Sequence, residues 1–238
     1  MIHERKIRLI CLPFAGVGIG FFRGWARLAG PDLDLVPMLL PGRERRISER
    51  PRTSVASALE EIQDQALACA ERGDPVMLFG HSLGAVLAYE LTRLLQRSGH
   101  AVDRLFVSGS MAPGDPIPAA YGAMTTGTDD EFVAALEERV GFRHEALHTA
   151  EVRPLVLPAL RADVSMHADY QAAACERLPV PITALRGSRD ELVSRTDMMR
   201  WSTLTTGEFD YVELEGSHMY LMDSVSEVLD VVGRHLRR

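Results

Sequence analysis

Short apolar segments alternate along the chain with longer stretches in which apolar residues recur every three or four positions. Each apolar segment is expected to form a buried strand, and the helical spacing is clearest at 54–71, 83–99 and 224–236. Strands that alternate with helices favour βαβ units, and therefore a mainly parallel sheet flanked by helices, the α/β class of fold. The predicted strands cover residues 7–14, 33–39, 76–80, 105–109, 182–187 and 209–216.

The alternation is interrupted between residues 111 and 178, a stretch without any segment of strand character. It begins with a Pro- and Gly-rich sequence at 112–118, and helices are predicted at 129–140 and between 145 and 174. A helical insertion in an α/β domain is expected to cover the C-terminal edge of the sheet, where ligands bind. The sequence therefore predicts a single domain over residues 1–238 with a helical lid at about 111–178.

The strand at 76–80 leads directly into Gly80-His81-Ser82-Leu83-Gly84, and a helix follows. The pattern G-x-S-x-G between a strand and a helix is typical of a nucleophile elbow, in which the serine sits on a sharp turn. The glycines leave room for the backbone to fold back, and the helix N-terminus favours developing negative charge. We expect Ser82 to be a nucleophile; the alternative is a glycine-rich turn with no chemical role.

A serine nucleophile needs a general base, and the base needs a carboxylate that orients it. After such an elbow the acid comes next along the chain and the histidine last. His218 fits the base, because it lies between the last predicted strand and the last helix. Asp190 fits the acid, because it follows the strand at 182–187, with Glu191 as the alternative. The remaining downstream histidines fall before the insertion, in the lid or in the final helix: His100, His144, His148, His167 and His235.

The oxyanion that forms during acyl transfer is usually held by two backbone N–H groups. One belongs to the residue after the serine, here Leu83, and the other to a loop after an early strand. The loop Pro13–Gly18 occupies that place, and Ala15 is the candidate donor. The Gly-x-Gly in this loop lacks the full spacing of a dinucleotide-binding fingerprint, so we do not interpret it as a cofactor site.

Taken together, these motifs resemble the type II (external, editing) thioesterases of polyketide and nonribosomal peptide assembly lines, which have the α/β-hydrolase fold. The resemblance extends nearly end to end, and the PGR and LRAD elements are its most diagnostic parts because generic hydrolases lack them. Phe14 stands where the family commonly has His or Tyr. The matching segments are LPFAGVG (12–18), LLPGRERRISE (39–49), GHSLG (80–84), LPALRAD (157–163) with Tyr170, GSRDELV (187–193) and GSHMYL (216–221).

The resemblance implies hydrolysis of acyl groups carried on the phosphopantetheine arm of acyl or peptidyl carrier protein domains. It assigns a catalytic triad to Ser82, Asp190 and His218, and an oxyanion hole to Ala15 and Leu83. Neither a metal nor a separate cofactor is expected. Three alternatives stay open: product release by cyclisation or acyl transfer with the same triad, a small-molecule carboxylesterase, and a binding protein built on the same fold.

The composition narrows the expected surroundings of the protein. A net charge of −7 disfavours nucleic acids and anionic membranes as general partners. The three cysteines, Cys11, Cys69 and Cys175, are too widely spaced for a metal site and odd in number, so free thiols in a reducing compartment are expected. The N-terminal residues lack the pattern of a secretory signal, and no segment is apolar for about 20 residues. A cytoplasmic protein without membrane contact is therefore predicted; the sequence leaves the oligomeric state open, with a monomer as the default.

Two further groups of residues suggest contacts with the substrate. Apolar lid residues could bind the acyl chain, although packing of the lid against the body is the commoner role; they are Met111, Met124, Phe132, Leu136, Phe142, Leu155 and Leu160. A run of arginines could meet the phosphate or an acidic carrier surface, or could be solvated or paired locally. This run consists of Arg43, Arg45, Arg46, Arg50 and Arg52, of which Arg43 is a candidate for a structural role.

Overall fold

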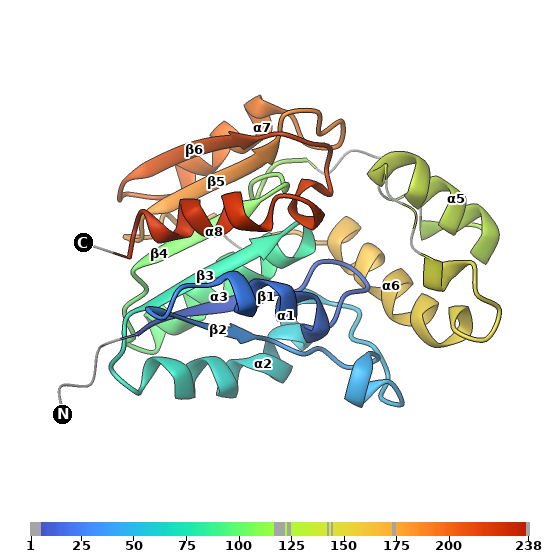
Figure 1. Ribbon diagram of the computed structural model, residues 1–238, viewed down its shortest axis with the longest axis horizontal. Helices are drawn as coiled ribbons and strands as arrows, with labels where there is room; N and C mark the ends of the chain where they lie inside the picture. Colours follow the sequence, from blue (N-terminus) through green and yellow to red (C-terminus); the bar gives the residue numbers. More distant parts are fainter. Residues whose placement is uncertain are drawn as a thin grey trace.

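The centre of the molecule is a six-stranded parallel sheet with the strand order β2-β1-β3-β4-β5-β6 (Figure 1). The computed structural model describes residues 6–116, 122, 125–141, 143, 145–172 and 175–236. All described strands run in the same direction, so their carboxyl ends meet at one edge of the sheet. The strands are β1 (Ile7–Leu12), β2 (Leu33–Pro37), β3 (Val76–His81), β4 (Arg104–Ser108), β5 (Ile182–Gly187) and β6 (Phe209–Leu214).

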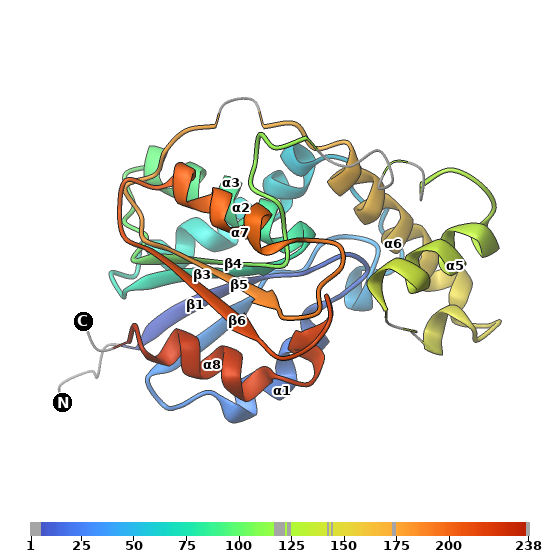
Figure 2. The same cartoon turned by 90° about the horizontal axis from the view of Figure 1, so that it is seen from above.

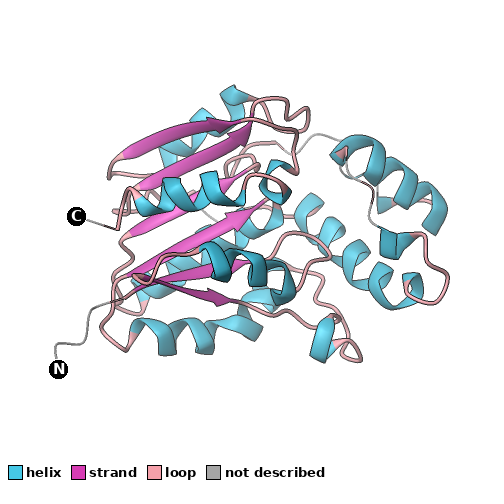
Figure 3. Ribbon diagram, viewed as in Figure 1, coloured by secondary structure: helices cyan, strands magenta, loops and turns pink. Residues whose placement is uncertain are grey.

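Helices cover both faces of the sheet, as Figures 2 and 3 show. On one face lie α2 (Val55–Ala70), α3 (Leu83–Arg97) and α7 (Arg195–Met199), and on the other lie α1 (Arg23–Leu28) and α8 (Val225–Gly233). Because side chains alternate along a strand, neighbouring residues serve opposite cores. Ile10 belongs to the first core and Leu9 to the second. Three of the four inner strands, β1, β3 and β4, are buried at every position, and β5 is buried at all but one, as expected for a sheet covered twice.

The predicted helical insertion lies between β4 and β5. It contains α5 (Asp129–Val140), a 3-10 turn (Glu145–Leu147) and α6 (Arg153–Ala168), which lie beyond the carboxyl ends of the strands in Figure 1. Thr128 and Glu131 form a capping box that fixes the start of α5. The lid has a small core of its own, made of Phe132, Val133, Leu147, Leu157, Leu160 and Val164. Within the described part of residues 111–177, no strand interrupts these helices.

Several predicted boundaries were wrong by a few residues. The first strand ends at Leu12 rather than at residue 14, because Pro13 has no N–H to donate to a neighbouring strand. The second ends at Pro37 rather than at residue 39. The sequence-based prediction also missed α1 and the short 3-10 helices, whose lengths are too small for a periodic pattern. These 3-10 helices are Ile19–Phe22, Glu44–Arg46, Arg200–Leu204 and Tyr220–Met222.

Candidate active site

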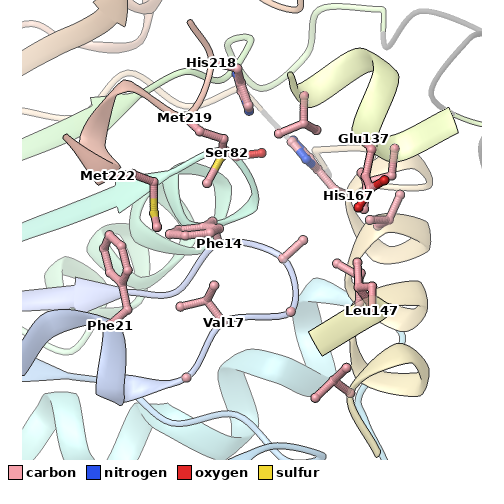
Figure 4. Close-up of a pocket in the computed structure, with 18 of the residues that line it drawn as sticks. Phe14, Val17, Phe21, Ser82, Glu137, Leu147, His167, His218, Met219 and Met222 are labelled. Carbon is pink, nitrogen blue, oxygen red and sulfur yellow. The ribbon is translucent and has the colours of Figure 1, made fainter. Parts of the chain in front are cut away.

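A pocket of about 460 Å³ opens where the carboxyl ends of β1, β3 and β6 meet the lid. Its body side is formed by the loop after β1, by Ser82 and by His218, and its lid side includes Leu136, Leu160 and His167. Figure 4 shows these walls facing each other, with the Ser82 hydroxyl between His218 and His167 in that view. Ser82 and His218, the two predicted catalytic residues that are farthest apart along the chain, therefore line one cavity.

Ser82 occupies a strained turn between β3 and α3. Its backbone lies at φ 52° and ψ −121°, a conformation that L residues rarely adopt. A Cβ atom on Gly80 would lie 1.9 Å from the carbonyl oxygen of Gly84, and one on Gly84 would lie 2.5 Å from the carbonyl oxygen of Leu12. The Ser82 N–H donates to the Ser108 carbonyl at 2.8 Å, which ties the turn to β4. Both glycines are thus required by direct contact between backbone segments.

The structure brings Asp190 and His218 together, although 28 positions separate them. Asp190 Oδ2 lies 2.9 Å from His218 Nδ1, and both side chains are buried. The other oxygen, Asp190 Oδ1, accepts hydrogen bonds from the backbone N–H groups of Leu192 and Val193 at 2.9 and 3.1 Å. Glu191, the alternative acid, is exposed. A carboxylate on Nδ1 holds the ring so that Nε2 is left for the nucleophile, which is the arrangement of a serine hydrolase.

The two candidate oxyanion donors come from two separate segments of the chain. Ala15 lines the pocket in the loop after β1, and Leu83 begins α3 directly after Ser82. Within the part of the chain that the structure describes, neither N–H donates a hydrogen bond to another protein group. The N–H of the next residue, Gly16, is already taken by Asp163 at 2.8 Å. In this loop the N–H of Ala15 is therefore available to an oxyanion, whereas the N–H of Gly16 is occupied by Asp163.

A buried polar chain behind His218 was not foreseen from the sequence. His81 Nδ1 lies 2.8 Å from Ser108 Oγ, which lies 2.7 Å from the Tyr220 hydroxyl. The rings of His81 and His218 are 4.8 Å apart between centroids. Burial, aided by His218, lowers the pKa of His81 well below its ordinary value, so His81 stays neutral. A neutral His81 avoids a second positive charge next to His218 when His218 is protonated. The position of His81 beside His218 follows only from tertiary contacts.

His167 is the lid histidine that reaches the pocket. It lies on α6, and burial together with the nearby His218 lowers its pKa from 6.5 to about 4. From the sequence it was only one of several histidines of the insertion. His144 lies outside the described residues, and His148 pairs with Glu137 at 2.7 Å. His167 is therefore a neutral imidazole on the lid wall at physiological pH.

We expect the protein to lose stability as the pH falls from 6.5 towards 4. In that window the unfolded chain protonates His167 while the folded protein keeps it neutral, so the unfolded state binds more protons. We therefore compare the free energy of unfolding of His167→Gln with that of wild type at each pH. The difference should favour the variant by about 1–3 kcal/mol more at pH 4.5 than at pH 7.5. Urea unfolding of both proteins at the two pH values measures this difference. An identical difference at both values would contradict it.

The predicted arginine run is largely engaged within the protein. Arg43 is buried against Asp163, while Arg46 and Arg52 both pair with Glu61. Arg45 and Arg50 are exposed. The interpretation as a locally paired loop therefore holds for Arg46 and Arg52, whereas Arg43 has the structural role that the sequence suggested.

The apolar lid residues divide into distinct roles. Leu136 and Leu160 line the pocket, whereas Phe132 is buried in the lid core and Leu155 is exposed. Met111 packs against the core of the body. Met124 and Phe142 lie outside the described residues. The expectation that most of these side chains pack the lid against the body is therefore not borne out by the five that the structure describes.

Neither a metal cluster nor a membrane-spanning helix occurs in the described part of the chain. In residues 6–116, 122, 125–141, 143, 145–172 and 175–236, no cluster of three or more His, Cys, Asp or Glu side chains could hold a metal ion. In the same ranges no helix is long and apolar enough to cross a membrane.

The chain is similar over nearly its whole length to known thioesterases. The thioesterase domain family matches residues 7–236. The chain is 33% identical over 233 residues to the gramicidin S biosynthesis protein GrsT of Aneurinibacillus migulanus, a match that covers 98% of this chain and 90% of GrsT.

Solved structures with the same architecture include thioesterases of biosynthetic pathways. RedJ, from the prodiginine pathway of Streptomyces coelicolor, is 32% identical with a TM-score of 0.85, and the match covers 96% of this chain and 85% of RedJ. BorB, a type II thioesterase from the borrelidin biosynthetic cluster, is 31% identical with a TM-score of 0.84, with 99% and 94% covered.

The parallel sheet, the strained serine after β3 and the histidine after β6 define the α/β-hydrolase fold. Within that class, the chain belongs to the thioesterase domain family. It is a thioester hydrolase, as the resemblance of its motifs predicted.

Proposed function

We propose that this enzyme removes acyl groups from the phosphopantetheine arm of acyl or peptidyl carrier protein domains, as an editing thioesterase of a polyketide or nonribosomal peptide assembly line. We also propose that it is a cytoplasmic enzyme, as its composition leads us to expect, with a monomer as the default oligomeric state. The observation that carries the proposal is the meeting of Ser82 and the Asp190–His218 pair in one pocket under the lid. The similarity to BorB and GrsT supports the substrate class.

In the proposed cycle, His218 removes the proton from Ser82 as Oγ attacks the thioester carbonyl carbon. Asp190 keeps the ring oriented and stabilises the imidazolium that forms, across the 2.9 Å contact with Nδ1. The N–H groups of Ala15 and Leu83 bind the oxyanion. The thiol of the arm leaves with the proton from His218, and the acyl group stays on Ser82. No metal or separate cofactor takes part.

The second half of the cycle restores the enzyme. His218 takes a proton from a water molecule, whose oxygen attacks the acyl carbon, and Ser82 leaves with that proton as the free acid forms. Release by water is the outcome expected of an editing enzyme. Cyclisation would instead need a nucleophile within the acyl chain, and the relatives do not favour that alternative.

We expect acyl groups on a carrier protein to be hydrolysed with a higher kcat/KM, by about tenfold or more, than the same groups on N-acetylcysteamine. The carrier adds contacts outside the pocket, and binding energy from such remote parts raises kcat/KM. A panel of short, branched and medium-chain acyl groups on both carriers measures this preference, with Ser82→Ala as the background. Equal kcat/KM on both carriers would argue against a carrier-bound substrate, and turnover in Ser82→Ala would contradict the nucleophile.

A further inference from the structure

A fully buried ion pair joins the lid to the body beside the active-site loop. Asp163 on α6 and Arg43 in the loop after β2 are 120 positions apart, yet Arg43 donates two parallel hydrogen bonds to the Asp163 carboxylate, at 2.6 and 3.0 Å. Asp163 is 0% exposed and Arg43 is 4% exposed. These residues are the final residues of the PGR and LRAD motifs, so the two most diagnostic motifs of the sequence meet at this contact.

Both members of the pair also hold the backbone of the loop after β1. Asp163 Oδ2 accepts a hydrogen bond from the Gly16 N–H at 2.8 Å, and Arg43 Nη1 donates to the Val17 carbonyl at 3.2 Å. Glu44 adds a third attachment, since its Oε1 accepts from the Gly20 N–H at 2.6 Å. The loop that carries Ala15 is therefore attached through side chains that come from outside it.

The backbone conformation at Gly16 and its close contact with the lid restrict how the loop can be oriented. Gly16 has φ +75°, and a Cβ atom there would lie 2.9 Å from Leu160 Cδ1 on the same lid helix. Because Gly16 directly follows Ala15, the direction of its N–H and the direction of the Ala15 N–H are set by the same few backbone torsions. Buried ion pairs contribute little net stability compared with apolar replacements, because desolvation offsets the attraction. A bidentate pair does, however, fix geometry strictly.

We propose that Asp163 and Arg43 are positioning residues for the oxyanion hole: together they hold the loop after β1 so that the Ala15 N–H points into the pocket. The inference rests on the proposed function, which assigns that N–H to the oxyanion. It also makes α6 part of the catalytic centre, because the helix that covers the acyl pocket carries the carboxylate that orients the loop. Oxyanion donors act through preorganisation, so a small displacement of the loop lowers the rate more than the affinity.

The test is the Asp163→Asn variant, because an asparagine cannot accept from both Arg43 nitrogens and from Gly16. We expect kcat on acyl-N-acetylcysteamine to fall by about 10- to 100-fold, less than the 10²- to 10³-fold loss typical of removing a donor outright. KM should change by less than about threefold. Inhibition by a trifluoromethyl ketone, whose adduct with Ser82 places an oxyanion in the hole, should weaken by the same factor as kcat. Asp169→Asn, an exposed carboxylate at the end of the same helix, is the matched control.

A second variant separates positioning from folding. Arg43→Met with Asp163→Leu replaces the buried pair by apolar side chains, a change that often preserves stability, but removes the acceptor for Gly16. We expect this variant to retain the wild-type thermal midpoint within a few degrees and still lose kcat and inhibitor affinity in parallel. Wild-type kcat in a folded double variant would overturn the proposal.

The remaining outcomes also decide the question. If the double variant does not fold, Asp163→Asn and the milder Arg43→Lys carry the test, and a loss of kcat without a matching loss of inhibitor affinity overturns the proposal. Failure of the proposed function looks different, because kcat/KM would then be equal on the carrier protein and on N-acetylcysteamine, or Ser82→Ala would keep its thioester turnover, whatever the effect of Asp163→Asn. An inactive Ser82→Ala beside a fully active Asp163→Asn would leave the triad assignment in place and remove only the positioning role.

Discussion

Replacing Ser82 or His218 with alanine is expected to lower kcat for thioester hydrolysis by about 10⁴- to 10⁶-fold, the largest effect expected of any substitution in the pocket. In the proposed cycle Ser82 supplies the attacking oxygen, and His218, held by Asp190 at 2.9 Å, supplies the proton transfer that activates it. Among the described residues, neither of the two nearby histidines shares the contact with Asp190. The buried His81 ring has its Nδ1 2.8 Å from Ser108 Oγ, and His167 lies on the lid side of the pocket.

The double variant Ser82→Ala/His218→Ala should be no slower than either single variant, since the two residues act as one unit. Asp190→Asn should lose less, about 10⁴-fold, because the ring is still present but its preferred tautomer is lost. Single-turnover hydrolysis of an acyl-N-acetylcysteamine thioester gives these rates, and circular dichroism verifies that each variant is folded. Losses that multiply in the double variant would show that Ser82 and His218 do not act on the same step.

Replacing Gly80 with alanine is expected to destabilise the protein by more than about 3 kcal/mol or to prevent folding. The added Cβ would lie 1.9 Å from the carbonyl oxygen of Gly84, and the obstructing atoms are backbone, so no rotamer change relieves the clash. Urea unfolding measures the loss. The matched control is Gly24→Ala in α1, where nothing lies within 4 Å of the new atom, and alanine there should be neutral or stabilise by up to about 1 kcal/mol.

A Gly80→Ala protein with wild-type stability and activity would mean that the turn at Ser82 is less tight than the structure shows. A protein that is folded but inactive would separate the two roles of the turn, since the strain at Ser82 would then serve presentation of the hydroxyl rather than folding. In either case the comparison with Gly24→Ala separates the effect of the crowded position at Gly80 from the effect of adding a methyl group.

The amino-acid sequence was sufficient to predict the parallel sheet, the helical insertion and the positions of the candidate triad. The strands could be predicted because a parallel sheet covered on both faces requires continuous apolar runs, as in β1 and β3. Ser82 could be predicted because the nucleophile elbow is a local structure that requires glycines two residues before and two residues after the serine. His218 and Asp190 were found from chain order and from their places after strands, since a parallel sheet delivers such residues to one edge.

Only the tertiary structure could choose between Asp190 and Glu191, because adjacent residues in a turn point in different directions and no periodic pattern distinguishes them. It also decided the roles of His81 and His167, whose neutrality results from burial among residues far away in sequence. The pairing of Arg43 with Asp163 is the clearest case. Each residue stands in a recognisable motif, but the contact joins positions 120 apart and depends on how the lid helix is seated on the body. Local patterns encode elements and turns, whereas the contacts that orient a catalytic loop arise when distant elements pack.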